Sequence, residues 1–115
     1  MPRIQLFNPG FTTADAKYPE LHAVAGELHL RFEDWQERLV QIQFHDVCAF
    51  RWQEAESLLS GEPYDGACEV LDSEWVKQHL AQGAVPAEMK LRHLRFNFNA
   101  CGQLEVLCVS HSVAA

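Results

Sequence analysis

Six histidines and four cysteines occur in a chain of only 115 residues, and these side chains readily bind metals or take part in acid–base and thiol chemistry. If residues 27–45 form a β-hairpin, Glu27, His29 and His45 lie within cross-strand or diagonal reach of one another on one face. A divalent metal needs three or four ligands at close distance, and no motif with metal-ligand spacing accompanies these three. We therefore expect solvated polar residues on an exposed sheet face, with no metal or other cofactor.

The cysteines match no redox or zinc motif. Their spacings of 20, 33 and 7 residues fit neither a paired zinc knuckle nor a CxxC motif, so free thiols are expected at Cys48, Cys68, Cys101 and Cys108. Cys101 falls at the tip of a predicted hairpin, where a thiol can be exposed. No serine has the flanking glycines of a hydrolase elbow, and no glycine-rich loop that would cradle phosphate is present. The sequence thus carries no recognisable catalytic motif.

The acidic residues are concentrated in one stretch. The chain holds 9 Lys and Arg against 16 Asp and Glu, a formal charge of −7, which argues against a nonspecific nucleic-acid binder and against docking on anionic membranes. Between Trp52 and Val76 lie seven acidic residues and no Lys or Arg, interleaved with Tyr64 and Trp75. Acidic side chains steer the encounter with a basic partner, and aromatic rings supply buried area. The alternative is that this stretch is a solvated face around two helices, with the tryptophans in the core.

The sequence supports three functional hypotheses. The first is a noncatalytic module that docks a basic protein such as a toxin or nuclease, with contact residues Glu54, Glu56, Glu62, Tyr64, Asp65 and Glu69. The second is a small-ligand or metal-dependent enzyme with a pocket near Asp46, Arg51, Trp52 and nearby histidines, because a carboxylate beside an arginine can bind a ligand or transfer a proton. The third is a structural domain that forms a homodimer through the second of its two hairpins.

The clearest structural signal lies near the carboxyl end, where apolar and polar residues alternate over residues 94–98 and 104–108. If the apolar residues of the two strands face each other across an antiparallel pair, Phe98 lies opposite Leu104. This register leaves a three-residue loop whose third position, Gly102, needs a left-handed backbone. Pattern and turn chemistry together predict a β-hairpin.

Another hairpin precedes it, with alternation over residues 28–32 and 40–44 and a turn around residues 35–37. The alternation continues beyond this point, but Asp46 would then face the core. Because an unpartnered buried carboxylate is costly, we expect a bulge or sheet corner there. The short apolar piece 4–7 predicts an additional edge strand.

Two helices are expected between the hairpins. Ser73 can cap a helix that runs from Glu74 to about Gln82 and is terminated by Gly83. One face of this helix is apolar and should pack on the sheet; it contains Trp75, Val76, His79 and Leu80. A weaker pattern over residues 53–60 indicates a second, short helix.

These elements predict a single α+β domain over residues 1–115. Its antiparallel sheet is built from hairpins at about 27–52 and 91–110, with one or two short helices between them packed on the sheet. Leu107 and Val109 lie on the face opposite the predicted core, so another element covers them or they form an apolar strip for self-association. Since no signal peptide or long apolar run is found, we expect a cytoplasmic protein.

Three blocks of sequence resemble a group of small uncharacterised bacterial proteins, some of which are similar to immunity proteins of bacterial toxin systems. The blocks are Phe44–Trp52, Val70–Trp75 and His93–Leu107, within a resemblance that covers roughly residues 27–110. The resemblance implies an α+β, noncatalytic, cytosolic protein, and it supplies no functional residue.

Overall fold

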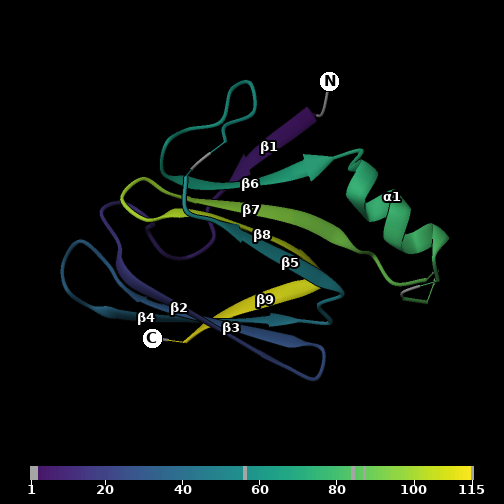
Figure 1. The fold of residues 1–115 in the computed structure, drawn as a ribbon, viewed down its shortest axis with the longest axis horizontal. Helices are drawn as coiled ribbons and strands as arrows, with labels where there is room; N and C mark the ends of the chain where they lie inside the picture. The colour runs from purple at the N-terminus through teal and green to yellow at the C-terminus, as the bar shows by residue number, and fades with distance from the viewer. Residues whose placement is uncertain (1–2, 56, 84, 87, 115) are drawn as a thin grey trace.

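The computed structural model describes residues 3–55, 57–83, 85–86 and 88–114, which form two antiparallel β-sheets and one helix. The five-stranded sheet has the order β1 (Arg3–Phe7), β6 (Gly66–Leu71), β7 (Arg92–Phe98), β8 (Gly102–Cys108), β5 (Ala49–Gln53). The four-stranded sheet has the order β2 (Lys17–Val24), β3 (Glu27–Glu33), β4 (Leu39–His45), β9 (Ser110–Ala114). Figure 1 shows the two sheets stacked one above the other.

The core lies between the sheets and is rich in phenylalanine. Phe32 and Phe44 of the four-stranded sheet meet Phe96 and Phe98 of the five-stranded sheet, and all four side chains are fully buried. Phe44 lies 5.4 Å from Phe96 and Phe32 lies 5.2 Å from Phe98, ring centre to ring centre, as expected for packed aromatic pairs. The expected α+β class therefore holds only loosely, because the molecule is mainly β and its core is formed by two sheets.

Both predicted hairpins are present, but they lie in different sheets: β3 pairs with β4, and β7 pairs with β8. The turn after β3 is fixed by Asp34, whose Oδ1 accepts hydrogen bonds from the backbone N–H groups of Gln36 and Arg38. The predicted edge strand near the amino terminus is also confirmed as β1. It pairs with β6, at one edge of the five-stranded sheet.

The predicted register of the β7–β8 hairpin was wrong by two residues. Leu104 lies opposite Phe96 instead of Phe98, and Phe98 pairs with Gly102, so the glycine belongs to the strand. Strand β5, which pairs with the other side of β8, explains why this position is a glycine. A Cβ on Gly102 would lie 2.2 Å from the carbonyl oxygen of Gln53 in β5. Gly102 is therefore required for close approach between strands, with φ of +150°.

Replacing Gly102 with alanine should lower the free energy of unfolding by about 1–3 kcal/mol, because β5 must move to admit the methyl group. Urea denaturation followed by tryptophan fluorescence measures the loss. Gly26→Asn is the matched control, since Gly26 also has positive φ, at +83°, but no described atom within 4 Å of an added Cβ. Equal stability of Gly102→Ala and the wild-type protein would contradict the close packing of β5 on β8.

The expected corner after β4 is confirmed. Asp46 adopts φ of +54°, and the chain then leaves the four-stranded sheet to form β5 in the five-stranded one. The chain also crosses between the sheets from β8 to β9, and this crossing is tied to the one after β4 by a 3.1 Å hydrogen bond from the Val109 N–H to the His45 carbonyl. The run predicted as one hairpin at about 27–52 is therefore divided between the two sheets.

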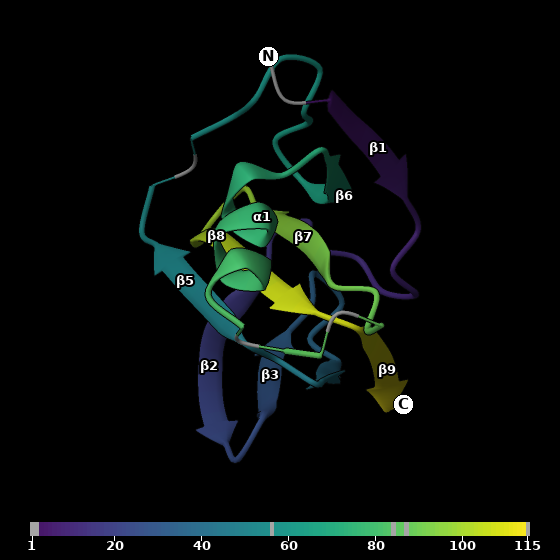
Figure 2. The same cartoon turned by 90° about the vertical axis from the view of Figure 1, so that its right-hand side faces the viewer.

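The helix capped by Ser73 is confirmed as α1 (Glu74–Ala81), and the Ser73 hydroxyl accepts the Val76 N–H. Figure 2 shows α1 in front of one end of the five-stranded sheet. Its side chains are only partly buried, so it covers little of the sheet. The second expected helix was wrong: Gln53 ends β5, and the described residues of 54–60 have no helical structure.

The β7–β8 hairpin has no free backbone edge, because β6 and β5 pair with its two outer sides. The homodimer predicted through this hairpin therefore cannot form by edge pairing of β7 or β8. Leu107 is fully buried and Val109 is half-buried, which excludes an exposed apolar strip at these positions. Within the described residues, no helix has the length and apolar character needed to cross a membrane.

Candidate functional site

The outer face of the five-stranded sheet carries polar side chains that are buried. Arg95 and Asn97 of β7 and Gln103 and Glu105 of β8 each have at most 5% of their surface exposed. They point away from the core because side chains alternate along each strand with Leu94, Phe96, Leu104 and Val106. Since burying charge without a partner is costly, this face requires a dense set of ion pairs and hydrogen bonds.

Arg95 lies at the centre of this set. It contacts Glu105, directly opposite in the β7–β8 register, at 2.6 Å from Nη1 to Oε1. It also donates to both carboxylate oxygens of Glu62, at 2.9 Å from Nε and 3.0 Å from Nη2. Arg51 of β5, the other neighbour of Glu105, donates its Nε to that carboxylate. We call Arg51, Glu62, Arg95 and Glu105 the ion cluster.

His93 extends the ion cluster to the start of α1. Its Nε2 lies 2.8 Å from Glu105 Oε1, and its Nδ1 lies 2.8 Å from Ser73 Oγ. Because Glu105 is ionised it can only accept, so Nε2 carries the hydrogen; in neutral imidazole Nδ1 then accepts the Ser73 hydroxyl. The Trp75 ring lies edge-on to His93 at 5.2 Å, and Arg51 stacks on the same ring at 4.3 Å. These contacts dock the beginning of α1 on the sheet.

The surroundings shift the pKa values of the acidic groups downward. Burial by itself raises the pKa of Glu105, but hydrogen bonds from His93 and Arg51 and the charge of Arg95 outweigh it and lower the pKa to about 2. For Glu62, burial is likewise outweighed by its hydrogen bonds to Arg95, so its pKa is also lowered. Burial raises the pKa of the adjacent Cys68 thiol to about 12, and Glu62 adds to this effect. Cys68 is therefore an unreactive thiol.

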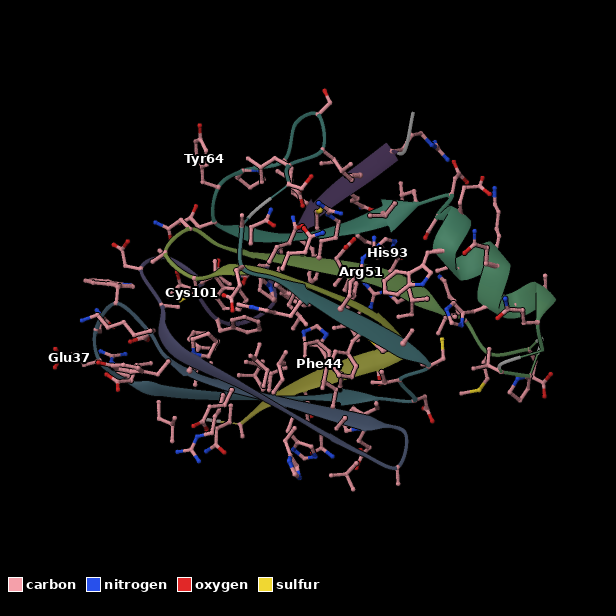
Figure 3. The ribbon with its side chains drawn as sticks, in the orientation of Figure 1. Glu37, Phe44, Arg51, Tyr64, His93 and Cys101 are labelled. Atoms are coloured by element: carbon pink, nitrogen blue, oxygen red, sulfur yellow. The ribbon has the colours of Figure 1, made fainter. Side chains whose placement is uncertain are left out.

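The ion cluster borders a cavity of about 440 Å³. Arg51, Ser73 and Trp75 line it together with His93 and Glu105, and Figure 3 shows Arg51 and His93 close to α1. The Arg51 side chain is half exposed, and its Nη nitrogens donate to none of the described residues. The cavity thus combines a guanidinium with an indole face.

Buried side chains of the same face also hold the segment between β5 and β6, residues 54–65, which we call the β5–β6 loop. The carbonyl of Ser57 accepts hydrogen bonds from Arg95 Nη2 at 2.6 Å and from Gln103 Nε2 at 3.2 Å. The carbonyl of Pro63 accepts from Asn97 Nδ2 at 3.0 Å. These anchors fix the loop backbone near both of its ends.

The predicted acidic surface divides into three parts. Glu54, Tyr64 and Asp65 are exposed on the β5–β6 loop, and Tyr64 projects from it with 73% of its surface accessible. Glu62 was wrongly assigned to a contact surface, because it is buried and paired with Arg95. Glu69 is half-buried on β6 and paired with Arg92 at 2.9 Å, so its charge is compensated. Glu56 lies outside the described residues.

The predicted alternative pocket does not assemble as expected. Arg51 lines the cavity, but Trp52 follows it in β5 and therefore points to the opposite face, where its ring lies 5.8 Å from Phe98. Asp46 is exposed at the corner between the sheets and does not line the cavity. Of the three residues, only Arg51 belongs to the site.

The predicted histidine group is partly brought together on the outer face of the four-stranded sheet. Glu27 Oε2 lies 3.0 Å from His45 Nδ1 and accepts from Gln43 Nε2 at 2.7 Å. His29 lies opposite Gln43 on β4, as predicted, and opposite His22 on β2. Among the described residues, no group of three or more His, Cys, Asp or Glu side chains is arranged to hold a metal ion.

Sequence reasoning missed the central members of the ion cluster. Arg95 and Glu105 fall at the polar positions of the alternation over residues 94–98 and 104–108, and no sequence motif connects His93 to them. The signal that reveals them is charge: the register that places Arg95 opposite Glu105 forms an ion pair, whereas the predicted register places it opposite Leu107. Cys101 is also less accessible than expected, because it is half-buried and its thiol donates to the Ala16 carbonyl at 2.8 Å.

Comparisons of the chain with protein-family models, with curated proteins and with solved structures found no significant match.

Proposed function

We propose that the protein acts by binding a basic protein partner through the β5–β6 loop. The observation that carries this proposal is the contrast between the two sides of the loop. One side is anchored by Arg95, Asn97 and Gln103, which are all buried. The other side presents Glu54, Asp65 and Tyr64 to solvent.

Anchoring of this kind favours binding, because an ordered loop loses little conformational entropy when it docks. Surface loops are ordinarily more mobile than the strands they connect. An exposed tyrosine is a common anchor of protein interfaces, and Leu58 adds a second exposed apolar side chain on the same loop. The acidic residues suit a basic partner, whose approach they would accelerate at low salt.

The acidic part of the surface is smaller than the sequence suggested. Ion pairs compensate several acids around the loop: Arg92 pairs with Glu69, Arg3 with Asp72, and Lys77 with Glu74. Of the described acids on the loop, Glu62 is paired with Arg95, whereas Glu54 and Asp65 are exposed and form no ion pair. The proposed contact surface is therefore Glu54, Leu58, Tyr64 and Asp65. An immunity-like role, in which such a surface occludes the active site of a basic toxin, agrees with this proposal.

The test is affinity capture of basic proteins from a lysate of the source cells, at low and high salt, with the wild-type chain and two variants. A partner should be enriched at low salt, and Tyr64→Ala combined with Asp65→Lys should weaken its binding at least tenfold. Glu37→Lys is the control, since Glu37 is an exposed acid on the β3–β4 turn. A partner that binds the loop variant and the wild-type chain equally, or the absence of any enriched partner, contradicts the proposal.

A further inference from the structure

A chain of hydrogen bonds crosses three strands on the outer face of the four-stranded sheet. It runs from Glu27 of β3 to His45 of β4 and on to Ser112 of β9, with 3.0 Å between Glu27 Oε2 and His45 Nδ1 and 3.0 Å between His45 Nε2 and Ser112 Oγ. The strands set this geometry, because His45 lies opposite Ser110 and Ser112 is its diagonal neighbour. Three adjacent strands thus hold a carboxylate, an imidazole and a hydroxyl in order.

The protonation states follow from the contacts. Hydrogen bonds from His45 and Gln43 lower the pKa of Glu27, so its carboxylate is ionised at neutral pH and can only accept. His45 Nδ1 must then carry the hydrogen that bonds to Glu27. In the neutral imidazole Nε2 is left as an acceptor for the Ser112 hydroxyl. A carboxylate that orients an imidazole, which in turn accepts a serine hydroxyl, is the arrangement that activates a serine nucleophile.

The Ser73–His93–Glu105 chain has the same residue types but a different chemical setting. Glu105 is shared with two guanidinium groups, Arg51 and Arg95, which oppose the formation of a positive imidazolium beside it. Ser73 is buried, and its hydroxyl caps α1. By contrast, Glu27 is hydrogen-bonded to the side chains of Gln43 and His45 and to no arginine or lysine among the described residues, and Ser112 is exposed. The Glu27–His45–Ser112 hydrogen-bond chain is therefore the one suited to nucleophilic catalysis.

Ser112 also opens onto a cavity, of about 300 Å³, that is separate from the site on the other sheet. Its lining includes His22, His29 and Gln43, which lie side by side on the same outer face as Ser112. The Gln43 side-chain amide donates one of its two N–H groups to Glu27, which leaves the second free of that bond. His29 lies opposite Gln43 in the β3–β4 register. These N–H groups can stabilise negative charge next to Ser112.

We propose that Ser112 is a nucleophile for acyl transfer from small carboxylic esters. The Ser112 oxygen attacks the ester carbonyl while its proton passes to His45 Nε2, and the bond to the alkoxy oxygen breaks as that proton is returned to the departing alcohol. Water then attacks the acyl-serine through the same base, releasing the carboxylic acid and restoring the hydroxyl. Glu27 is the positioning residue that holds the imidazole in the required tautomer. This activity is independent of partner binding by the β5–β6 loop.

The test is labelling of the purified full chain with an alkyl fluorophosphonate, followed by intact-mass measurement and peptide mapping. The serine oxygen displaces fluoride from phosphorus, so one adduct per chain is expected, on Ser112. His45→Gln should slow labelling by about 100-fold or more, as loss of a general base does. Glu27→Gln should slow it at least tenfold while the conservative Glu27→Asp restores part of the rate, which a merely structural role would not produce.

Ser110→Ala is the matched control, because Ser110 lies on the same strand and face and should leave labelling unchanged. Circular dichroism checks that each variant is folded. Absence of an adduct, an adduct on another residue such as Ser73, or labelling that ignores the His45→Gln substitution would overturn the proposal. Hydrolysis of p-nitrophenyl acetate should follow the same order among the variants.

Discussion

Replacement of Arg95 by methionine should lower the free energy of unfolding by about 3–5 kcal/mol, the usual cost of removing one partner from a buried ion pair. Methionine fills similar volume, but Glu62 and Glu105 lose the cation that lies between them. The carbonyl of Ser57 also loses its shortest hydrogen bond. Urea denaturation at neutral pH, followed by tryptophan fluorescence, measures the effect.

Arg92→Met is the matched control on the same strand. The Arg92 side chain is 30% exposed and pairs with Glu69, so solvent screens the pair and its loss should cost less than about 1 kcal/mol. Adding Glu62→Gln and Glu105→Gln to Arg95→Met should recover part of the lost stability, because the buried negative charges are then removed. If the two arginine variants are equally stable, the ion cluster does not hold the outer face together.

Acid should destabilise the wild-type protein strongly between pH values of about 4.5 and 2. The pKa of Glu105 is lowered from its ordinary value of 4.5 to about 2 in the folded chain. A lowered folded-state pKa gives stability that is present above the unfolded-state pKa and is lost as the pH falls through the folded-state value. A shift of this size corresponds to about 3 kcal/mol, all of it present at neutral pH. Glu62 contributes in the same direction, because its pKa is lowered as well.

The measurement is urea denaturation of the wild-type protein and Glu105→Gln at several pH values from 7 to about 2. Glu105→Gln should be less stable at neutral pH, and its stability should fall less steeply below pH 4.5. Glu74→Gln is the control, since the Glu74 side chain is 81% exposed on α1 and its loss should leave the steep fall unchanged. A Glu105→Gln variant with the wild-type pH dependence would show that this carboxylate does not carry the effect.

The two stability predictions also bear on function. Arg95 ties Glu105 in the sheet to Ser57 in the β5–β6 loop, so a residue of the ion cluster also anchors the loop that carries the proposed contact surface. A variant that breaks the cluster without unfolding the chain should therefore also release the loop. Binding of a partner would then weaken although no contact residue has changed.

The sequence by itself determined some of the local elements, although β2, β6 and β9 were not predicted. Alternation of apolar residues predicted both hairpins and the corner at Asp46, because side chains of a strand point to opposite faces in turn. The short apolar piece at residues 4–7 predicted the edge strand β1. The helix capped by Ser73 was also predictable, since capping and helical spacing are properties of neighbouring residues. The net charge of −7 argues against nucleic acid and anionic membranes as partners, which stays a prediction.

Only the tertiary structure decided which residues meet across these elements. The register of β7 and β8 depends on β5, which approaches Gly102 from a segment about 50 residues earlier in the chain. That register, and not composition, brings Arg95 opposite Glu105 and leads to the burial of Glu62, which looked like a surface acid. The division into two sheets likewise follows from packing of the aromatic core. Long-range pairing of this kind depends on several strands at once, so no local pattern encodes it.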